Sequence, residues 1–297
     1  MSTTPATCAG LGGLPLVTLR AADGAAAEIY LHGAHVTSWC PAPGLDERLF
    51  LSARSEFRPG AAIRGGIPVI FPQFAAEGPL PRHGFARTTT WDLIGVQHAE
   101  DGDAIATLGL SDSADTRAIW PAEFRASLLV RVGGPRLVVA LAVENVGTTP
   151  FTFTCALHTY LRVVDAAHAE VTGLQGTQYR DAADRGVLCV DDAAVIRVAG
   201  EFDRVYVGAP RSLVVREPGS SLGIVSDQFP DVVIWNPGPT RAATLTDLEP
   251  NGERTMLCVE AAAVQQPITL KPHERWHGSQ TLDASVAHDS ISPEAAA

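Results

Sequence analysis

The chain of 297 residues contains almost no lysine and has an excess of acidic side chains. Lys271 is its single lysine, and 22 cationic side chains stand against 33 carboxylates, which gives a formal net charge of −11. Nucleic-acid binding without sequence preference needs many lysines and arginines to displace counterions from phosphates. We therefore expect no nucleic-acid partner, although a local group of arginines remains compatible with a small anionic ligand.

The sequence also lacks the cysteine patterns of a zinc site or a disulfide framework. Its five cysteines are odd in number and widely spaced, and no two of them form a CxxC pair. Structural zinc sites and small secreted domains normally show such pairs or closely spaced, even-numbered sets. We expect a reduced protein with buried thiols, as is usual in the cytoplasm. These cysteines are Cys8, Cys40, Cys155, Cys189 and Cys258.

Long hydrophobic runs are missing as well. No stretch of about 18 apolar residues is uninterrupted, and the N-terminal segment MSTTPATCAGLGGLPLV has no basic region before an apolar one. A transmembrane helix needs about 20 apolar residues, and a secretory signal needs a basic start. We expect neither membrane insertion nor secretion, and hence a cytoplasmic location.

Short segments with alternating apolar residues are what the sequence does contain. Residues 124–132 alternate, and residues 136–144 beyond a Gly-Gly-Pro break are apolar on both faces, which predicts a hairpin whose second strand is central. Similar runs predict strands at 26–32, 35–41, 103–110, 150–163, 203–208, 211–216, 222–226, 231–236 and 254–262. No long helical period competes with them, so the fold class is all-β, a large antiparallel β-sandwich.

The chain shows neither an internal repeat nor a linker long enough to divide it. All-β sandwiches often exceed 200 residues as one domain. We therefore predict a single domain over residues 1–297, with a core from about 14 to 284 and a frayed tail from about Ala284.

A histidine lies on the polar side of the predicted strand at 150–163. Alternation places Cys155, Leu157 and Leu161 on the core face, so His158 shares the other face with Tyr160. Imidazole titrates near neutral pH, which makes His158 a candidate general acid. The alternative is a solvent-facing or hydrogen-bonded histidine on a sheet surface.

One carboxylate interrupts the apolar run at 255–264. A buried charge is costly unless it is paired, and partial burial raises the pKa of a carboxyl group toward the range of a useful base. Glu260 is therefore a candidate general base, and the alternative is an edge-strand glutamate in solvent. We expect Glu260 and His158 on well-separated strands.

Two segments rich in glycine and proline, IRGGIPVIFPQF and PRHGFAR, carry arginines. Glycine allows close backbone approach, and proline stiffens a loop. Arg64, Arg82 and Arg87 could together bind an anion, because guanidinium groups match phosphate oxygens through paired hydrogen bonds. The alternative is surface ion pairs for the arginines and, for His83, a role in orienting the loop.

Six segments in this order, IRGGIPVIFPQF, HGFAR, ALHTYLRV, FDRVY, VVIWNP and MLCVEAA, resemble the hexose-6-phosphate 1-epimerase branch of the aldose 1-epimerases, over residues 33–278. The resemblance implies a galactose-mutarotase-like sandwich that uses no metal and no organic cofactor. It implies action at C1 of an aldohexose 6-phosphate such as glucose 6-phosphate. The expected partner is thus a small sugar phosphate, and the oligomeric state stays open, with a monomer slightly favoured.

The resemblance also implies roles for individual residues. His158 and Glu260 match the catalytic histidine and glutamate of the family, and Arg64 and Arg87 match substrate-binding arginines. Asp203 matches an acidic residue that holds sugar hydroxyls.

Two features lie outside the usual family pattern. Arg82, directly before HGFAR, is a further expected contact. Ala75 stands where a glycine often follows FPxF, in a short loop that rims the expected pocket.

Opening of the sugar ring requires loss of the C1 hydroxyl proton and protonation of the ring oxygen. Rotation about C1–C2 and reclosure then give the other anomer. We expect Glu260 as the base and His158, protonated at the start, as the acid, each contributing about 10²–10⁴-fold. Two alternatives remain open: a free-sugar aldose 1-epimerase without the arginine pocket, and a non-catalytic sugar-phosphate sensor or carbohydrate-binding module on the same sandwich.

Overall fold

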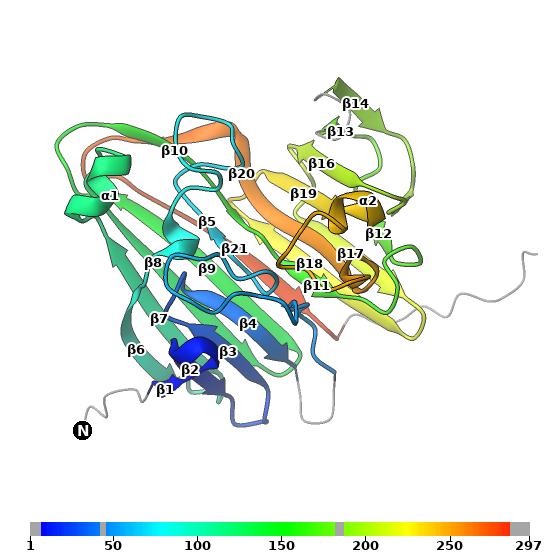
Figure 1. Cartoon of the computed structure of the whole chain (residues 1–297), viewed down its shortest axis with the longest axis horizontal. Coiled ribbons are helices and arrows are strands. Elements are labelled where there is room, and N and C mark those ends of the chain that lie inside the picture. The colour runs from blue at the N-terminus through cyan, green and yellow to red at the C-terminus, as the bar shows by residue number, and fades with distance from the viewer. Residues whose placement is uncertain (1–6, 42–45, 182–186, 286–297) are drawn as a thin grey trace, which may run out of the picture.

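The computed structural model describes residues 7–41, 46–181 and 187–285. These residues form antiparallel sheets of four, eight and nine strands (Figure 1). The prediction of a large antiparallel β-sandwich is confirmed. That the whole chain forms one domain stays a prediction, and the expected frayed tail lies, from residue 286 on, outside the described residues.

The smallest sheet is formed by the N-terminal strands. In order, they are β1 (Cys8–Ala9), β2 (Pro15–Arg20), β3 (Ala26–Tyr30) and β4 (His35–Cys40). This sheet contacts the nine-stranded sheet through β2 and β3.

The eight-stranded sheet carries Asp203 on β16 and Glu260 on β20, and His158 lies between two of its strands. Its order is β14 (Val187–Asp191), β13 (Thr177–Asp181), β16 (Phe202–Val207), β19 (Asp231–Asn236), β20 (Met256–Leu270), β10 (Phe151–Leu157) and β5 (Val69–Ile70), with β11 (Tyr160–Arg162) also paired to β20.

The nine-stranded sheet forms the second large layer. Its order is β15 (Val195–Arg197), β12 (Glu170–Thr172), β17 (Ser212–Glu217), β18 (Ser220–Asp227), β21 (Arg275–Asp283), β9 (Arg136–Asn145), β8 (Phe124–Gly133), β7 (Ala104–Ser111) and β6 (Asp92–His98).

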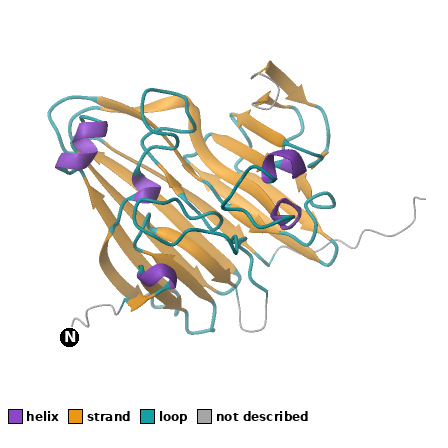
Figure 2. Cartoon of the chain, viewed as in Figure 1, coloured by secondary structure: helices purple, strands orange, loops and turns teal. Residues whose placement is uncertain are grey.

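Helices are short and lie in the connections between strands (Figure 2). Two α-helices and three 3₁₀ helices occur in the described part of the chain: α1 (Ala114–Ile119), α2 (Gly238–Ala242), η1 (Leu11–Gly13), η2 (Ala86–Thr88) and η3 (Gly252–Thr255). In α1, the Ser113 hydroxyl accepts a hydrogen bond from the Thr116 backbone N–H and caps the helix.

The predicted hairpin is confirmed as β8 and β9, and β9 lies between β8 and β21 in its sheet. The single run predicted at 150–163 divides into β10 and β11, because the strand is interrupted at residues 158 and 159. Strand β21 was not predicted. Its inward positions Gly278, Gln280 and Leu282 include only one large apolar residue, so no apolar period marks this strand.

The main core lies between the two large sheets and includes residues from both. Leu128 and Leu141 of the nine-stranded sheet and Leu157 and Val259 of the eight-stranded sheet are fully buried members of this cluster. Burial of side chains of this size contributes about 1.5–3 kcal/mol each. The core therefore holds in place the sheet that carries Asp203 and Glu260.

An aromatic cluster anchors the two motif segments to this core. The Phe71 ring contacts Phe85 with centroids 6.2 Å apart, and Phe124 and Phe153 at 5.3 Å each. Edge-on contacts of this kind add about 0.5–1.5 kcal/mol beyond area burial. The FPQF and HGFAR segments are thus packed against each other.

All five cysteines are free thiols in the structure. The expectation that they are buried holds for Cys155 and Cys258. It is wrong for Cys8, which is exposed on the short edge strand β1, and for Cys40 and Cys189, which are only partly buried. Within the described residues, no helix combines the length and apolar character needed to cross a membrane.

Candidate active site

His158, in the gap between β10 and β11, lies beside Glu260 on the neighbouring strand β20. The register pairs Leu157 with Ala261 and Tyr160 with Cys258, which places His158 opposite Glu260. The His158 Nδ1 atom lies 3.3 Å from Glu260 Oε1. The expectation of well-separated strands is therefore wrong: the two strands are about a hundred positions apart in sequence but adjacent in the sheet.

The pair faces a cavity of about 490 Å³. Its lining contains all six residues predicted from the sequence and adds aromatic, apolar and charged neighbours. The lining residues are Arg64, Phe74, Ala75, Ala76, Glu77, Arg82, His83, Arg87, His158, Asp203, Val205, Val233, Trp235, Arg241, Leu245 and Glu260. This volume suits a monosaccharide-sized ligand.

Burial perturbs both members of the pair. Glu260 is 1% exposed, which excludes an edge-strand glutamate in solvent, and His158 is 7% exposed. Burial raises the pKa of Glu260, and the charge of Asp203 raises it further. Burial lowers the pKa of His158, as do His83 and Arg87. Both shifts disfavour charge separation within the pair.

Aromatic rings hold His158 on several sides. The Tyr160 ring stacks on the imidazole with centroids 4.7 Å apart and planes 9° apart, and Trp235 meets it edge-on at 5.9 Å. The prediction that His158 and Tyr160 share a face is confirmed. The shared face is the wall of the cavity rather than an open sheet surface.

His83 is a site residue that sequence reasoning undervalued. Its ring centroid lies 5.8 Å from that of His158, and its Nδ1 accepts a hydrogen bond from the Ala75 backbone N–H at 3.2 Å. Burial lowers the pKa of His83 to about 2, so the imidazole is neutral and carries its proton on Nε2. His83 orients the loop, as considered from the sequence, and also lines the cavity.

The charge of Arg64 is matched by a carboxylate that sequence reasoning did not find. Its Nε and Nη2 atoms donate to the Asp247 oxygens at 3.2 Å, and Nη1 donates to Tyr160 Oη at 3.0 Å. Asp247 belongs to a loop without any periodic pattern, so no signal in the sequence marks it as a partner of Arg64. Arg64 keeps N–H groups for a ligand, but its charge is balanced.

Arg87 differs from Arg64 because no carboxylate among the described residues forms an ion pair with it. Its Nη2 donates to the Arg82 backbone carbonyl at 3.3 Å, and its buried Nε has no hydrogen-bond partner. Burial lowers the pKa of Arg87, and the nearby Arg64 and Arg82 lower it further. A guanidinium group held in this way favours an anion beside it.

Asp203 reaches the cavity from β16, two strands away from Glu260. The sheet pairs Asp203 with Trp235 and Val233 with Glu260. Burial raises the pKa of Asp203, whereas Arg241 and Arg82 lower it. Asp203 and the His158–Glu260 pair thus border the same space.

The loop after FPQF rims the cavity, as predicted, through Ala75, Ala76 and Glu77. The Ala75 backbone is left-handed, with φ 46°, a conformation that glycine adopts more readily. Glu77 Oε1 accepts a hydrogen bond from Arg180 Nη2 at 2.6 Å, which ties the rim to β13.

The glycines of the RGG turn are needed for close approach, as predicted. Gly66 has φ 61°, and a Cβ at this position would lie 2.2 Å from the Val36 carbonyl oxygen. His35 is 0% exposed, and its Nε2 lies 2.7 Å from the Gly65 carbonyl oxygen, to which it donates. These contacts fix the turn that carries Arg64.

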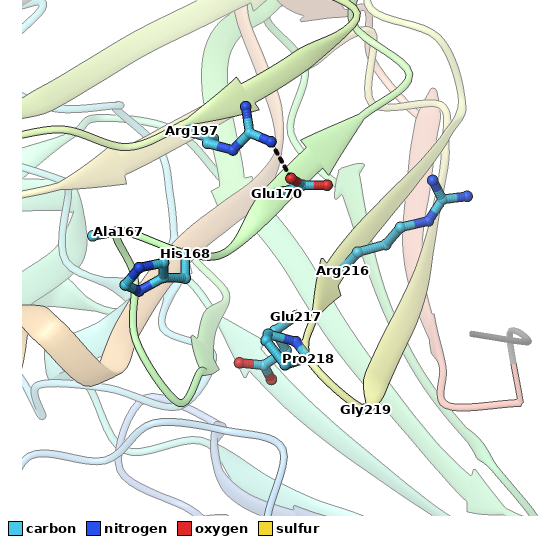
Figure 3. Close-up of a pocket in the computed structure, with 8 residues that line it drawn as sticks. All are labelled: Ala167, His168, Glu170, Arg197, Arg216, Glu217, Pro218 and Gly219. Atoms are coloured by element: carbon cyan, nitrogen blue, oxygen red, sulfur yellow. Dashed lines mark hydrogen bonds and ion pairs between the residues drawn. The ribbon is translucent and has the colours of Figure 1, made fainter. Parts of the chain in front are cut away.

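A second hollow, of about 520 Å³, shares no lining residue with this cavity (Figure 3). Glu170 there pairs with Arg197, and Glu217 Oε2 accepts a hydrogen bond from the Val164 backbone N–H at 2.7 Å. These two carboxylates have local partners, whereas Arg87 in the His158 cavity forms no ion pair with a carboxylate of the described residues. The His158 cavity, which also contains the histidine–glutamate pair, is therefore the stronger candidate site.

No group of three or more His, Cys, Asp or Glu side chains in the described residues has a geometry that could hold a metal ion. The expectation that neither a metal nor an organic cofactor takes part stays a prediction.

Similarity to known proteins identifies the family of this chain. The pattern of the aldose 1-epimerase family matches residues 15–283. The chain belongs to the aldose 1-epimerase family, so it is an isomerase of the epimerase class.

The names of individual relatives are narrower than that of the family. A candidate glucose-6-phosphate 1-epimerase of Cenchrus ciliaris is 38% identical over 92% of this chain and 85% of its own length. A candidate glucose-6-phosphate 1-epimerase of Escherichia coli (strain K12) is 34% identical over 86% of this chain and 86% of its own length. The crystal structure of a candidate mutarotase from Salmonella typhimurium has a TM-score of 0.86 at 29% identity and covers 95% of both chains.

Proposed function

We propose that this protein is a hexose-6-phosphate mutarotase that interconverts the α and β anomers of an aldohexose 6-phosphate, with glucose 6-phosphate as the preferred candidate. The observation that carries the proposal is the shared cavity. A buried histidine–glutamate pair and an arginine without an ion-pair partner line the same 490 Å³ space. The names of the relatives from Cenchrus ciliaris and Escherichia coli support the same substrate.

The side-by-side placement of the pair suits anomer exchange. The hydroxyl oxygen that loses a proton and the ring oxygen that gains one are both bonded to C1. An acid and a base that serve them must therefore be neighbours, as His158 and Glu260 are at 3.3 Å. Glu260 projects from β20, and His158 lies in the two-residue gap between β10 and β11, which both pair with β20, so the register of these strands sets the spacing of the two side chains.

The proposed reaction uses one proton on the pair. Glu260 removes the C1 hydroxyl proton while His158 protonates the ring oxygen, and the C1–O5 bond breaks to give the open-chain aldehyde. Rotation about C1–C2 presents the other face of the aldehyde. Glu260 then returns its proton to the aldehyde oxygen, His158 recovers its proton from the C5 hydroxyl, and the ring closes.

The pKa shifts support this exchange. In water, a histidine and a glutamate that share one proton form an ion pair, because imidazole is the stronger base. Burial raises the pKa of Glu260 and lowers that of His158, so both shifts bring the neutral pair closer in energy to the ion pair. The closed sugar requires one of these protonation states and the open chain requires the other.

The phosphate is assigned to Arg87 and Arg82, with Arg64 as a further donor. Arg87 lacks a carboxylate partner among the described residues, whereas Asp247 balances the charge of Arg64. Hydrogen bonds between charged groups contribute about 1.5–3 kcal/mol. Asp203, on the same wall as Glu260, is assigned to the sugar hydroxyls.

His83 is assigned a supporting role at the sugar. Its Nδ1 is occupied by the Ala75 backbone N–H, so the Nε2–H is the donor it can offer to a ligand. A neutral donor close to His158 can bind a sugar oxygen without adding charge to the buried pair.

Replacement of either member of the pair tests the chemistry. Glu260→Gln and His158→Gln should each lower kcat for glucose 6-phosphate anomerisation by about 10²–10⁴-fold, measured by NMR exchange spectroscopy. Glu260→Asp, which keeps a carboxylate, should retain more activity than Glu260→Gln. Near-full activity of Glu260→Gln would exclude Glu260 as the base.

Two other functions were open from the sequence. A free-sugar epimerase would use the same pair, but Arg82 and Arg87 beside it favour a phosphorylated substrate. A non-catalytic binding module would need no matched acid and base. Membership in the aldose 1-epimerase family supports an enzyme rather than such a module.

A further inference from the structure

A buried polar bridge crosses the sandwich directly behind the His158–Glu260 pair. Alternation turns Thr159 and Val259 to the face opposite the cavity, toward the second sheet. There they meet Gln280, an inward-facing residue of β21 in the nine-stranded sheet. Thr159 is 0% exposed and Gln280 is 2% exposed, so this contact lies in the core of the sandwich.

Every polar group in the bridge has a partner of the right kind. The Gln280 Nε2–H donates to the Val259 carbonyl oxygen at 3.0 Å, and Gln280 Oε1 accepts a hydrogen bond from the Thr159 hydroxyl. A flipped amide would direct Oε1 at the Val259 carbonyl, where neither atom can donate. The carbonyl therefore fixes the orientation of the Gln280 amide.

The bridge replaces a hydrogen bond that the sheet lacks at His158. In an antiparallel pair, the N–H and C=O of one residue point to the same neighbouring strand. The Val259 N–H donates to the Thr159 carbonyl at 3.0 Å, but the Thr159 N–H turns back to the Leu157 carbonyl at 2.9 Å. The Val259 carbonyl thus loses its strand partner, and the Gln280 amide takes that place.

The peptide whose N–H turns back to Leu157 is the one that joins His158 to Thr159. β10 ends at Leu157 and β11 begins at Tyr160, so the imidazole projects from a local kink between two regular strands. A kink of this kind leaves a buried carbonyl without a ladder partner, which is unfavourable unless another donor reaches it. Gln280 supplies that donor from the opposite sheet.

We propose that Thr159 and Gln280 are positioning residues that hold the kinked backbone at His158 and so keep its imidazole aligned with Glu260. This inference rests on the proposed acid–base function of the pair. Neither residue lines the cavity, so both act through His158 rather than on the sugar.

The test measures kcat and KM for glucose 6-phosphate anomerisation in matched variants. Gln280→Met keeps the length of the side chain but removes both polar atoms, and Thr159→Val removes only the hydroxyl. Each should lower kcat about tenfold to a hundredfold, the effect of a small misalignment, and change KM less than twofold. Thr159→Ser keeps the hydroxyl and should restore kcat to within about threefold of the wild type.

Leu282→Ala is the control for a loss of packing. Leu282 is 1% exposed, two residues beyond Gln280 on the same face of β21. This variant should be less stable than the wild type but keep its kcat. An unchanged kcat in both Gln280→Met and Thr159→Val would overturn the proposal, as would an equal loss of kcat in Leu282→Ala. If Gln280→Met does not fold, the kcat of Thr159→Val is compared with that of Thr159→Ser. Equal kcat values in these two variants would then overturn the proposal.

A second readout separates this proposal from the proposed function. The ring ¹⁵N and ¹H resonances of His158 report its environment without substrate. They should shift in Gln280→Met and remain near their wild-type positions in Leu282→Ala. If the wild type does not accelerate anomerisation, the proposed mutarotase function is wrong. A shift of the His158 resonances in Gln280→Met but not in Leu282→Ala would still support the role of Thr159 and Gln280 in positioning His158. Unshifted His158 resonances in Gln280→Met would contradict it.

Discussion

At the scale of single residues, the two cavity arginines Arg64 and Arg87 differ in whether a carboxylate balances their charge. Asp247 balances Arg64 through two hydrogen bonds, but no carboxylate in the described residues pairs with Arg87. The sequence could identify both arginines because they lie in the recognisable motifs RGG and HGFAR. It could not separate their roles, because Asp247 comes from an irregular loop 183 positions later in the chain.

Arg87→Ala should lower kcat/KM for glucose 6-phosphate about tenfold to a hundredfold, mainly through KM, because a charged hydrogen bond contributes about 1.5–3 kcal/mol. For free glucose the change should stay within about threefold. NMR exchange measurements with each sugar check the difference. Arg131→Ala makes the same change in net charge at a residue paired with Asp101 and Asp103, and it should alter neither value. Equal losses for both sugars in Arg87→Ala would contradict the phosphate assignment.

Ala75→Gly should raise the free energy of unfolding by about 0.5–1 kcal/mol. Ala75 has φ 46°, and an L-residue in the left-handed region costs about 1–2 kcal/mol, part of which the flexibility of glycine in the unfolded chain offsets. Urea denaturation measures the change. Ala76→Gly is the control, because Ala76 is not in the left-handed region, and it should lower the stability instead. A loss of stability in Ala75→Gly would show that this backbone is not strained.

At the scale of elements, the site is formed by strand register and two tight turns. Alternation could predict the β8–β9 hairpin and the faces of β10 and β20. It could not predict that His158 lies opposite Glu260, because register depends on the pairing of segments about a hundred residues apart. The kink at His158 was also hidden, because its compensating donor is on β21, a strand without an apolar period.

Gly66→Ala should lower the free energy of unfolding by about 2–5 kcal/mol, because it adds a clash with the Val36 carbonyl to the strain of φ 61°. Gly60→Ala is a matched control. Gly60 has φ 79°, but an added Cβ would meet nothing within 4 Å, so only about 1–2 kcal/mol of strain applies. Thermal and urea unfolding compare the two variants. Equal losses would mean that close packing of the RGG turn is not what requires Gly66.

At the scale of the whole molecule, stability depends on histidines that are buried in neutral form. Burial lowers the pKa of His35 to about 4 and that of His83 to about 2. Composition and alternation could predict the sandwich, but they could not show which histidines are enclosed. His35 is enclosed because the RGG turn folds over β4 and accepts its N–H at the Gly65 carbonyl.

The free energy of unfolding should therefore contain a pH-dependent contribution from His35. The unfolded chain takes up a proton near pH 6.5 and the folded protein near pH 4, so the unfolded state binds more protons between these values. Stability is lost as the pH falls through this window, by about 2 kcal/mol from pH 7 to pH 5. Glu260, whose pKa burial raises, acts in the opposite direction, so the comparison is between variants.

Urea denaturation of the wild type and of His35→Gln at pH 7 and pH 5 measures this contribution. The drop in stability between the two pH values should be about 2 kcal/mol smaller in the variant. The same drop in both proteins would show that His35 is protonated in the folded state.

The central claim is that a buried acid–base pair and an arginine pocket act together on a phosphorylated sugar. It is tested most directly by the rate of α-to-β exchange of glucose 6-phosphate and of glucose, measured by NMR exchange spectroscopy with and without the purified protein. The account predicts strong acceleration for glucose 6-phosphate and little or none for glucose. Acceleration of glucose alone, or of neither sugar, would contradict it.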